Sequence, residues 1–271
     1  MVYRVWLFMV VWLSFLSISC AVVPGDSEKA AKQRNNLQDN FQEGRLDTSR
    51  WQRTQAGDFN EITVDVIDVD PGEGADYRLR LRANTIGTRD DTVKFLGIRS
   101  VDRIGFAQGV KVSLDLDWNK QANGCYLTAS VYLCPTITSS NPRDEADWFK
   151  IEYVGVPPGK NARSVVAKKV SGRLQYLDRD DWPQNRRGRA IANQHIDIFI
   201  NGHGLRIQEK GRELYGVPSH KLSFNQAYLY LQMSSHSNYP SREIYFDNII
   251  VSKDDAELNI AVEGVAQKDE Q

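Results

Sequence analysis

Apolar and polar residues alternate in many short runs of this 271-residue chain. Within residues 227–233, Leu229, Leu231 and Met233 alternate with tyrosines and a glutamine. A period of two predicts a β-strand with one apolar face, because successive side chains of a strand point to opposite sides of its sheet. Residues 243–251 are richer in β-branched and aromatic residues, which predicts a strand closer to the core.

Similar runs recur along the chain, with turn-forming residues between them. They cover residues 62–69, 77–82, 109–118, 125–133, 147–154, 195–200, 203–208 and 212–215, with shorter runs at 163–170 and 173–177. The dipeptide Asn201-Gly202 favours a type I′ hairpin, because both turn residues take positive φ, and a second turn follows at residues 209–211. About a dozen such strands predict an all-β fold, a two-sheet antiparallel sandwich.

The composition sets limits on the class of protein. Hydrophobic residues make up 41% and charged residues 25% of the chain, near the averages of soluble globular proteins. Lys and Arg number 34 against 35 for Asp and Glu, so no overall field favours nucleic acid or an anionic membrane surface.

The first 20 residues have the order of an export signal. Arg4 precedes the apolar residues 5–16, and small residues follow. Cys20 stands where bacterial lipoprotein signals place the acylated cysteine; Ser19 fits that pattern, but Ser17 occupies the usual leucine position. Lipidation of Cys20, secretion after cleavage and an uncleaved anchor all stay open. We expect an exported protein, lipid-anchored in the cell envelope or secreted, attached to a membrane only through a lipidated Cys20.

Cys125 and Cys134 bracket one alternating run. Nine strand steps place them about 30 Å apart, which rules out a mutual disulfide. We expect two free and mostly buried thiols.

The polar side of residues 227–233 carries Tyr228, Tyr230 and Gln232. Aromatic rings stack on flat ligands and amides pair with hydroxyl groups, so this face suits a hydroxyl-rich ligand. An ordinary strand with one wetted face fits the same pattern.

Three segments resemble the concanavalin A-like lectin/glucanase superfamily. They are the opening DNFQEGRLDTSRW from Asp39, the hairpin HIDIFINGHGLRIQEKGREL from His195 and the closing REIYFDNIIVS, which ends at Ser252. The resemblance implies one jelly-roll domain over residues 39–252, after a polar tether at 21–38 and before a polar tail at 253–271. It also implies a concave sheet face that receives a polysaccharide or oligosaccharide. The superfamily contains lectins, glucanases, lyases and inert modules, so the activity stays open.

The resemblance further implies a structural calcium that ties the first segment to the last strand. Asp247 matches the aspartate of the closing motif, and Asp39 is its candidate neighbour. Carboxylates are suitable ligands because Ca²⁺ prefers hard oxygens. A turn cap or an arginine partner is the alternative role for Asp247. We expect no other cofactor.

Glycosidases of this superfamily carry glutamates and an aspartate at alternating positions of one strand, and this chain lacks that motif. Its nearest pair is Asp115 and Asp117, which we expect to be polar and ligand-facing or solvated. Lyases of the superfamily use Arg, Gln, His and Tyr on the concave face. The residues here that could share such a face are Arg78, Arg80, Lys150, His195, Tyr228, Tyr230 and Gln232. His195, Tyr230 and Arg80 are the catalytic candidates.

Three charged segments have simpler interpretations. Residues 68–76 resemble a calcium loop only superficially, and a solvated hairpin tip is favoured. Residues 144–147 form an acidic loop. Residues 178–189 form a charged loop in which Trp182 either packs onto the sandwich or offers a stacking platform beside three arginines.

The leading hypothesis is an exported, non-catalytic, carbohydrate-binding β-sandwich. A polysaccharide lyase or glycoside hydrolase acting on the same concave face is the first alternative. A structural surface module that contacts another protein is the second.

Overall fold

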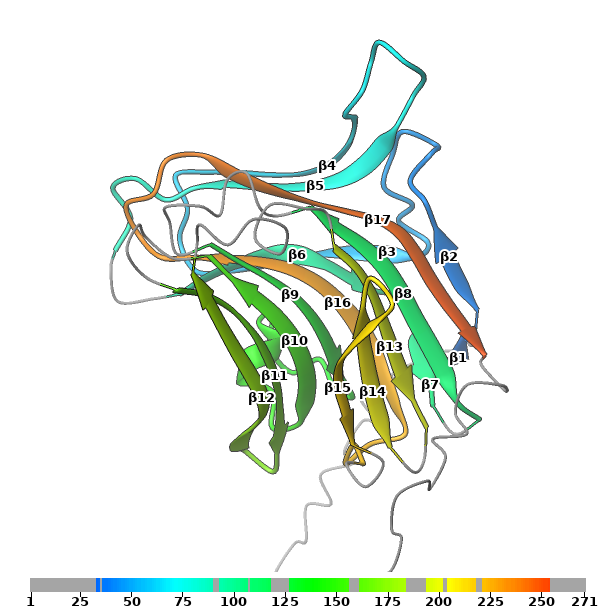
Figure 1. Ribbon diagram of the computed structural model, residues 1–271. Helices are drawn as coiled ribbons and strands as arrows, with labels where there is room; N and C mark the ends of the chain where they lie inside the picture. The colour runs from blue at the N-terminus through cyan, green and yellow to red at the C-terminus, as the bar shows by residue number, and fades with distance from the viewer. Residues whose placement is uncertain are drawn as a thin grey trace, which may run out of the picture. The chain divides into compact units, whose positions relative to one another are not determined.

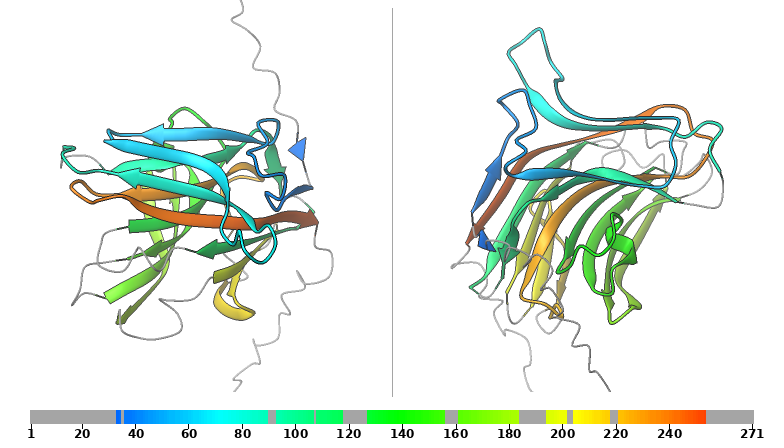
Figure 2. Two further views of the ribbon diagram at one scale, coloured as in Figure 1. Left: turned by 90° about the horizontal axis from the view of Figure 1, so that it is seen from above. Right: turned by 180° about the vertical axis from the view of Figure 1, so that it is seen from behind.

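The computed structural model describes residues 33–34, 36–89, 93–106, 108–117, 127–155, 161–183, 194–201, 204–217 and 221–253. These residues form two β-sheets packed face to face, with a short 3₁₀ helix, η1 (Pro142–Asp144), between two strands (Figures 1 and 2). Both sheets bend in the same direction in Figure 1. We call the sheet on the inside of the bend the concave sheet and the other the convex sheet. In this part of the chain, no helix has the length and apolarity needed to cross a membrane.

The concave sheet has nine strands. Its main path runs β1 (Gln33–Arg34), β7 (Arg103–Gly105), β16 (Gln226–Ser235), β9 (Leu127–Cys134), β10 (Trp148–Val154), β11 (Asn161–Val170) and β12 (Arg173–Pro183). Beside β7, β16 also pairs with β6 (Lys94–Ser100), which pairs with β3 (Trp51–Ala56). All these pairings are antiparallel except that of β1 with β7.

The convex sheet has eight strands. Its path runs β15 (Arg212–Val217), β14 (Leu205–Glu209), β13 (Gln194–Ile200), β8 (Val110–Asp117), β17 (Arg242–Lys253), β5 (Tyr77–Asn84) and β4 (Glu61–Asp68). The eighth strand, β2 (Leu37–Asp39), pairs with the end of β17.

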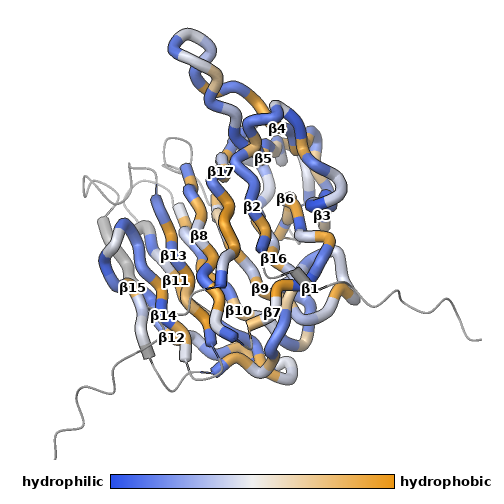
Figure 3. Tube along the Cα trace, turned by 90° about the vertical axis from the view of Figure 1, so that its right-hand side faces the viewer, coloured by the Kyte–Doolittle hydropathy of each residue, from blue (hydrophilic) through white to orange (hydrophobic). Residues whose placement is uncertain are grey.

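The core lies between the two sheets and follows from the alternation in the sequence. Leu229, Leu231 and Met233 of β16 belong to it, as the sequence predicted, and each is at most 1% exposed. Leu114 and Leu116 of β8 join it from the convex sheet. Figure 3 shows hydrophobic and hydrophilic residues alternating along the strands. Because every second residue faces the core, each sheet keeps one outer face for other roles.

The turns refine several sequence predictions. Lys210 and Gly211 have φ of 49° and 74°, as a type I′ turn between β14 and β15 requires. The β13–β14 hairpin is present, but Asn201 N–H donates to Gly204 O at 3.2 Å, so the turn begins one residue later than expected. The prediction of a loop from residue 178 was wrong over its first part, because β12 continues to Pro183.

Strand structure begins earlier in the chain than the expected start of the domain at Asp39. Strand β1 and the first two residues of β2 fall within the expected tether, and Leu37 of β2 is 5% exposed. The signal segment with Cys20, residue Cys125 and residues 254–271 lie outside the described residues. Cys134 is a free, buried thiol, as predicted.

The expected acidic loop at residues 144–147 contains a buried carboxylate. Glu145 is only 2% exposed. Its oxygens accept hydrogen bonds from Thr136 Oγ1 at 2.6 Å, Thr138 Oγ1 at 2.9 Å and Ser139 N–H at 2.7 Å. The prediction of an acidic loop did not include this burial. Through these hydrogen bonds Glu145 holds together the connection between β9 and β10. Residues 68–76 form the predicted hairpin tip, where Val69 N–H donates to Asp76 O at 2.9 Å.

Candidate functional site

The candidate residues lie on two sheets rather than on one face. Lys150, Tyr228, Tyr230 and Gln232 belong to the concave sheet, whereas Arg78, Arg80, Asp115, Asp117, His195 and Asp247 belong to the convex sheet. Both sets point outward, away from the shared core, so the prediction of one common face was wrong. The period of two shows which residues of one strand share a face, but it does not show which sheet the strand joins. Trp182 lies in β12, and its side chain is not among those that the structure describes.

The outer side of the concave sheet, which we call the concave face, is organised in rows across neighbouring strands. Pairing aligns one row as Gln52, Arg99, Tyr230, Tyr132, Lys150, Ala167 and Tyr176. The next row contains Thr54, Gly97, Gln232, Ser130 and Glu152. The outer end of the first row is open, because Tyr176 on edge strand β12 is 64% exposed.

The tyrosines in the middle of this face pack together. Tyr132, Tyr228 and Tyr230 belong to a second apolar cluster and are 1%, 3% and 1% exposed. The ring of Trp148 meets that of Tyr132 edge to face, with 5.6 Å between the centroids. The alternative of an ordinary wetted strand face is therefore wrong for β16.

Three buried polar atoms of this face have no hydrogen-bond partner among the described residues: Tyr132 Oη, Tyr230 Oη and Gln232 Oε1. The amide nitrogen of Gln232 donates to Thr54 Oγ1 at 3.4 Å, which fixes the orientation of the amide. Burial raises the pKa of Tyr132 and of Tyr230. Both phenols therefore stay protonated at neutral pH and can donate hydrogen bonds.

Charged groups flank these atoms. Lys150 Nζ donates to Glu152 Oε2 at 2.5 Å, and Ser130 Oγ lies 3.4 Å from the same oxygen. Among the described residues that point outward from β9, β10 and β16, Glu152 is the one with a carboxylate. Arg99 donates to Gln52 Oε1.

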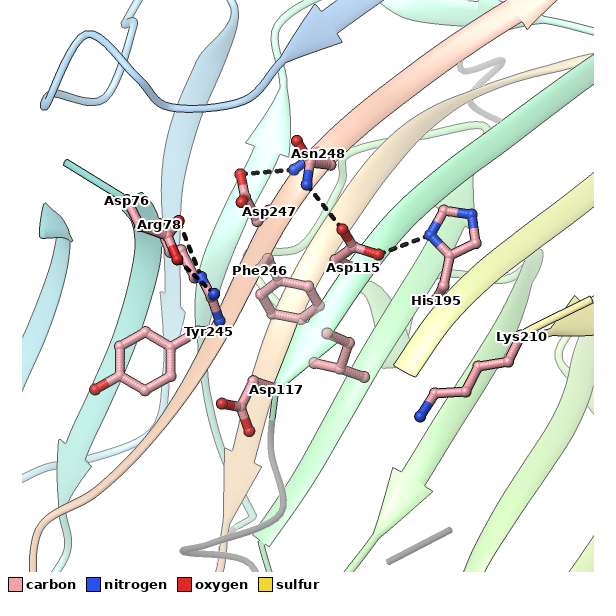
Figure 4. Close-up of a pocket in the computed structure, with 11 residues that line it drawn as sticks. Asp76, Arg78, Asp115, Asp117, His195, Lys210, Tyr245, Phe246, Asp247 and Asn248 are labelled. Atoms are coloured by element: carbon pink, nitrogen blue, oxygen red, sulfur yellow. Dashed lines mark hydrogen bonds and ion pairs between the residues drawn. The ribbon is translucent and has the colours of Figure 1, made fainter. Parts of the chain in front are cut away.

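The convex sheet carries a pocket of about 350 Å³ on its outer face (Figure 4). It is lined by Asp115, Asp117, His195, Asp247 and Arg78, among other residues. These five residues are candidates that the sequence singled out and that the fold brings together.

A β-bulge shapes this pocket. The register of β17 against β8 shifts between Asp247 and Ile250, and Asn248 takes a φ of 50°. Asn248 Nδ2 donates to Asp115 Oδ2 at 2.8 Å, while His195 Nδ1 lies 2.7 Å from Asp115 Oδ1. Asp115 is thus held from two sides, as Figure 4 shows.

Asp39 and Asp247 do not fit a shared calcium site. The strands β2 and β17 that carry them are neighbours, as the resemblance implied. The oxygens of Asp39, however, accept from Trp51 Nε1 at 2.8 Å and from Phe41 N–H at 2.9 Å. Asp247 instead faces the pocket. Among the described residues no group of three or more His, Cys, Asp or Glu side chains is arranged to hold a metal ion.

Burial raises the pKa of Asp247 to about 6, against an ordinary value of 3.8. A folded-state pKa above the unfolded one means that the wild-type protein loses stability as pH rises from 4 through 6. Because asparagine does not titrate, we expect Asp247→Asn to raise the free energy of unfolding by about 1–2 kcal/mol at pH 7.5. The gain should shrink towards zero by pH 4 in urea titrations. An equal gain at both pH values would contradict this.

Sequence reasoning missed several residues of these two sites. Tyr132 was within a predicted strand, and its alternation could have shown that it faces away from the core. Arg99 was not in a predicted strand. Lys210 and Asn248 line the pocket because of a turn and a bulge, for which the alternation holds no signal.

Solved structures of low sequence identity share this architecture. An endo-β-galactosidase from Clostridium perfringens that releases GlcNAcα1-4Gal superposes with a TM-score of 0.55 at 10% identity, over 82% of this chain and 64% of that one. Bacillus licheniformis β-glucanase superposes with a TM-score of 0.54 at 10% identity, over 82% of this chain and 100% of that one. The globular domain of T. cruzi calreticulin superposes with a TM-score of 0.55 at 12% identity, over 80% of this chain and 87% of that one.

This domain has the concanavalin A-like jelly-roll fold. The fold implied by the sequence resemblance is thereby confirmed. No family model and no curated protein matches the sequence. The neighbours include carbohydrate-active enzymes, and at this level of identity the likeness concerns the fold alone.

Proposed function

We propose that the protein binds a polysaccharide or oligosaccharide on its concave face. The observation that carries the proposal is the set of buried atoms without hydrogen-bond partners there: Tyr132 Oη, Tyr230 Oη and Gln232 Oε1. A buried polar group without a partner costs about 1–3 kcal/mol. Sugar hydroxyls both donate and accept hydrogen bonds, so a sugar ring that displaces the present cover of these atoms beside β9 and β16 would give them partners.

The chemistry of the row supports a sugar ligand. The protonated phenols of Tyr132 and Tyr230 supply donors, and the Gln232 amide supplies an acceptor. At the open edge, the exposed ring of Tyr176 offers a flat surface on which a further sugar ring can stack. The row crosses seven neighbouring strands from β3 to β12 and so suits an extended chain of sugar units.

Binding without catalysis is favoured over hydrolysis or elimination. Retaining glycosidases use two carboxyl groups about 5 Å apart. Among the described outward residues of the central strands β9, β10 and β16, only Glu152 carries a carboxyl group, so these residues do not supply such a pair. His195 and Tyr230 lie on different sheets, which argues against a lyase that pairs them.

The test is Tyr230→Phe, which removes one hydroxyl and keeps the ring. We expect affinity for a bound glycan to fall about 5- to 10-fold, as for one lost hydrogen bond. The melting temperature of the free protein should not fall, because the hydroxyl has no partner among the described residues. Titration calorimetry would use a glycan that the wild-type protein retains, chosen from neutral and uronate polysaccharides.

The matched control is Tyr77→Phe, which makes the same change on β5 of the convex sheet. It should leave glycan affinity unchanged. Retention of no glycan, or equal losses for the two variants, would overturn the proposal. New reducing ends would instead indicate a glycosidase, and unsaturated products a lyase.

Export fits this role. We infer from residues 1–20 that the protein leaves the cytoplasm, with Cys20 either lipidated or removed. Mass spectrometry of the mature N-terminus would separate a lipidated Cys20 from a cleaved chain.

A further inference from the structure

Two guanidinium groups lie beside one aromatic ring on the concave face. The Cζ atoms of Arg99 and Arg103 are 4.8 Å and 5.2 Å from the ring centroid of Tyr228. Arg99 comes from β6 and Arg103 from β7, and both strands pair with β16, which carries Tyr228. Two like charges are thus gathered at one place, which is unfavourable unless an anion joins them.

Neither guanidinium meets a carboxylate within the described part of the chain. Arg99 is 8% exposed and donates to the neutral amide of Gln52. Arg103 Nε is buried and has no hydrogen-bond partner among the described residues. On the convex sheet, by contrast, Arg78 and Arg80 are paired with aspartates at 2.6 Å and 2.7 Å.

The rest of the concave face adds to this positive charge. By strand register, its outward cations also include Lys150, Arg163, Lys169 and Arg179. The acids that the register places on this side in the described part of these strands are Glu152 and Asp181, which is opposite Arg163. Glu152 is engaged by Lys150 at 2.5 Å. The pocket on the convex sheet has the opposite character, with Asp115, Asp117 and Asp247 in its lining.

We propose that Arg99 and Arg103 bind an anionic group, a carboxylate or sulfate, carried by the glycan. The fork of a guanidinium matches the paired oxygens of such groups and forms charge-assisted hydrogen bonds with them. An anion here would accept from Arg103 Nε and neutralise both charges beside Tyr228. The inference rests on the proposed function and narrows its ligands to acidic glycans.

The test compares polygalacturonate, dextran sulfate and uncharged dextran at low and high salt. We expect at least one anionic polymer to bind about 10-fold or more tightly than dextran, with the preference shrinking as salt rises. The double variant Arg99→Gln/Arg103→Gln should lose about 10- to 100-fold in affinity for that polymer. Arg45→Gln removes a cation whose side chain is 79% exposed, and should change little. Thermal melts establish that each variant is folded.

The outcomes separate this inference from the proposed function. Binding of dextran sulfate alone, or of polygalacturonate alone, supports the inference and identifies the anion as sulfate or carboxylate. Equal affinity for dextran and both anionic polymers, or full binding by the double variant, overturns it. If either of these results is found and Tyr230→Phe still weakens glycan binding, the concave face binds glycans but does not select acidic ones. If no glycan binds, both fall.

Discussion

The substitution Gly97→Ala should lower the free energy of unfolding by about 3 kcal/mol. Gly97 lies on β6, opposite Gln232 of β16. A Cβ atom at this position would overlap the carbonyl oxygen of Leu231 and would lie 2.9 Å from Gln232 Cγ. Because the carbonyl belongs to the backbone of the neighbouring strand, β6 and β16 would have to move apart. The shift would also displace the Gln232 amide and so weaken glycan binding.

Urea unfolding at neutral pH measures this effect. The matched control is Gly72→Ala in the β4–β5 turn, where an added Cβ meets nothing within 4 Å. Its effect should stay within about 0.5 kcal/mol. If Gly97→Ala were equally mild, the close approach of β6 to β16 would not hold in solution.

The second large effect is expected for Glu145→Ala, at about 3 kcal/mol of lost stability. Burial alone would raise the pKa of Glu145, but hydrogen bonds from Thr136, Ser139 and Thr138 outweigh it and lower the pKa below 4.5. The carboxylate is therefore ionised at neutral pH. Alanine would remove the buried acceptor of three hydrogen bonds in the connection that precedes β10.

The neighbouring acid provides the control. Asp144 accepts one long bond, from Ser139 Oγ at 3.3 Å, so Asp144→Ala should cost well under 1 kcal/mol. A lowered pKa means that the contribution of Glu145 is present above pH 4.5 and is lost as pH falls through the folded-state pKa. The gap between wild type and Glu145→Ala should therefore narrow on acidification. A constant gap would contradict the role of the ionised carboxylate.

The alternation of residues was sufficient to predict the fold class and the core face of β16. It could not reveal β6, because all of Lys94–Ser100 is buried on both faces and the alternation is lost. Arg99 was therefore absent from the predicted site.

The grouping of site residues was harder to predict than the strands. His195 and Tyr230 both alternate with core residues, yet pairing assigns β13 to one sheet and β16 to the other. Sheet membership depends on long-range strand pairing, which local periodicity does not encode. The bulge that turns Asn248 towards Asp115 is equally invisible to a strict period of two.

Hydroxyl-radical footprinting with and without a saturating glycan tests most directly whether the concave face is the binding surface. Tyr176 is 64% exposed on this face, and Ile250 is 38% exposed on the convex sheet, so both should be oxidised in the free protein. Binding on the concave face predicts that the glycan protects Tyr176 and leaves Ile250 reactive. Saturation with no protection of Tyr176, or protection of Ile250 alone, would contradict it.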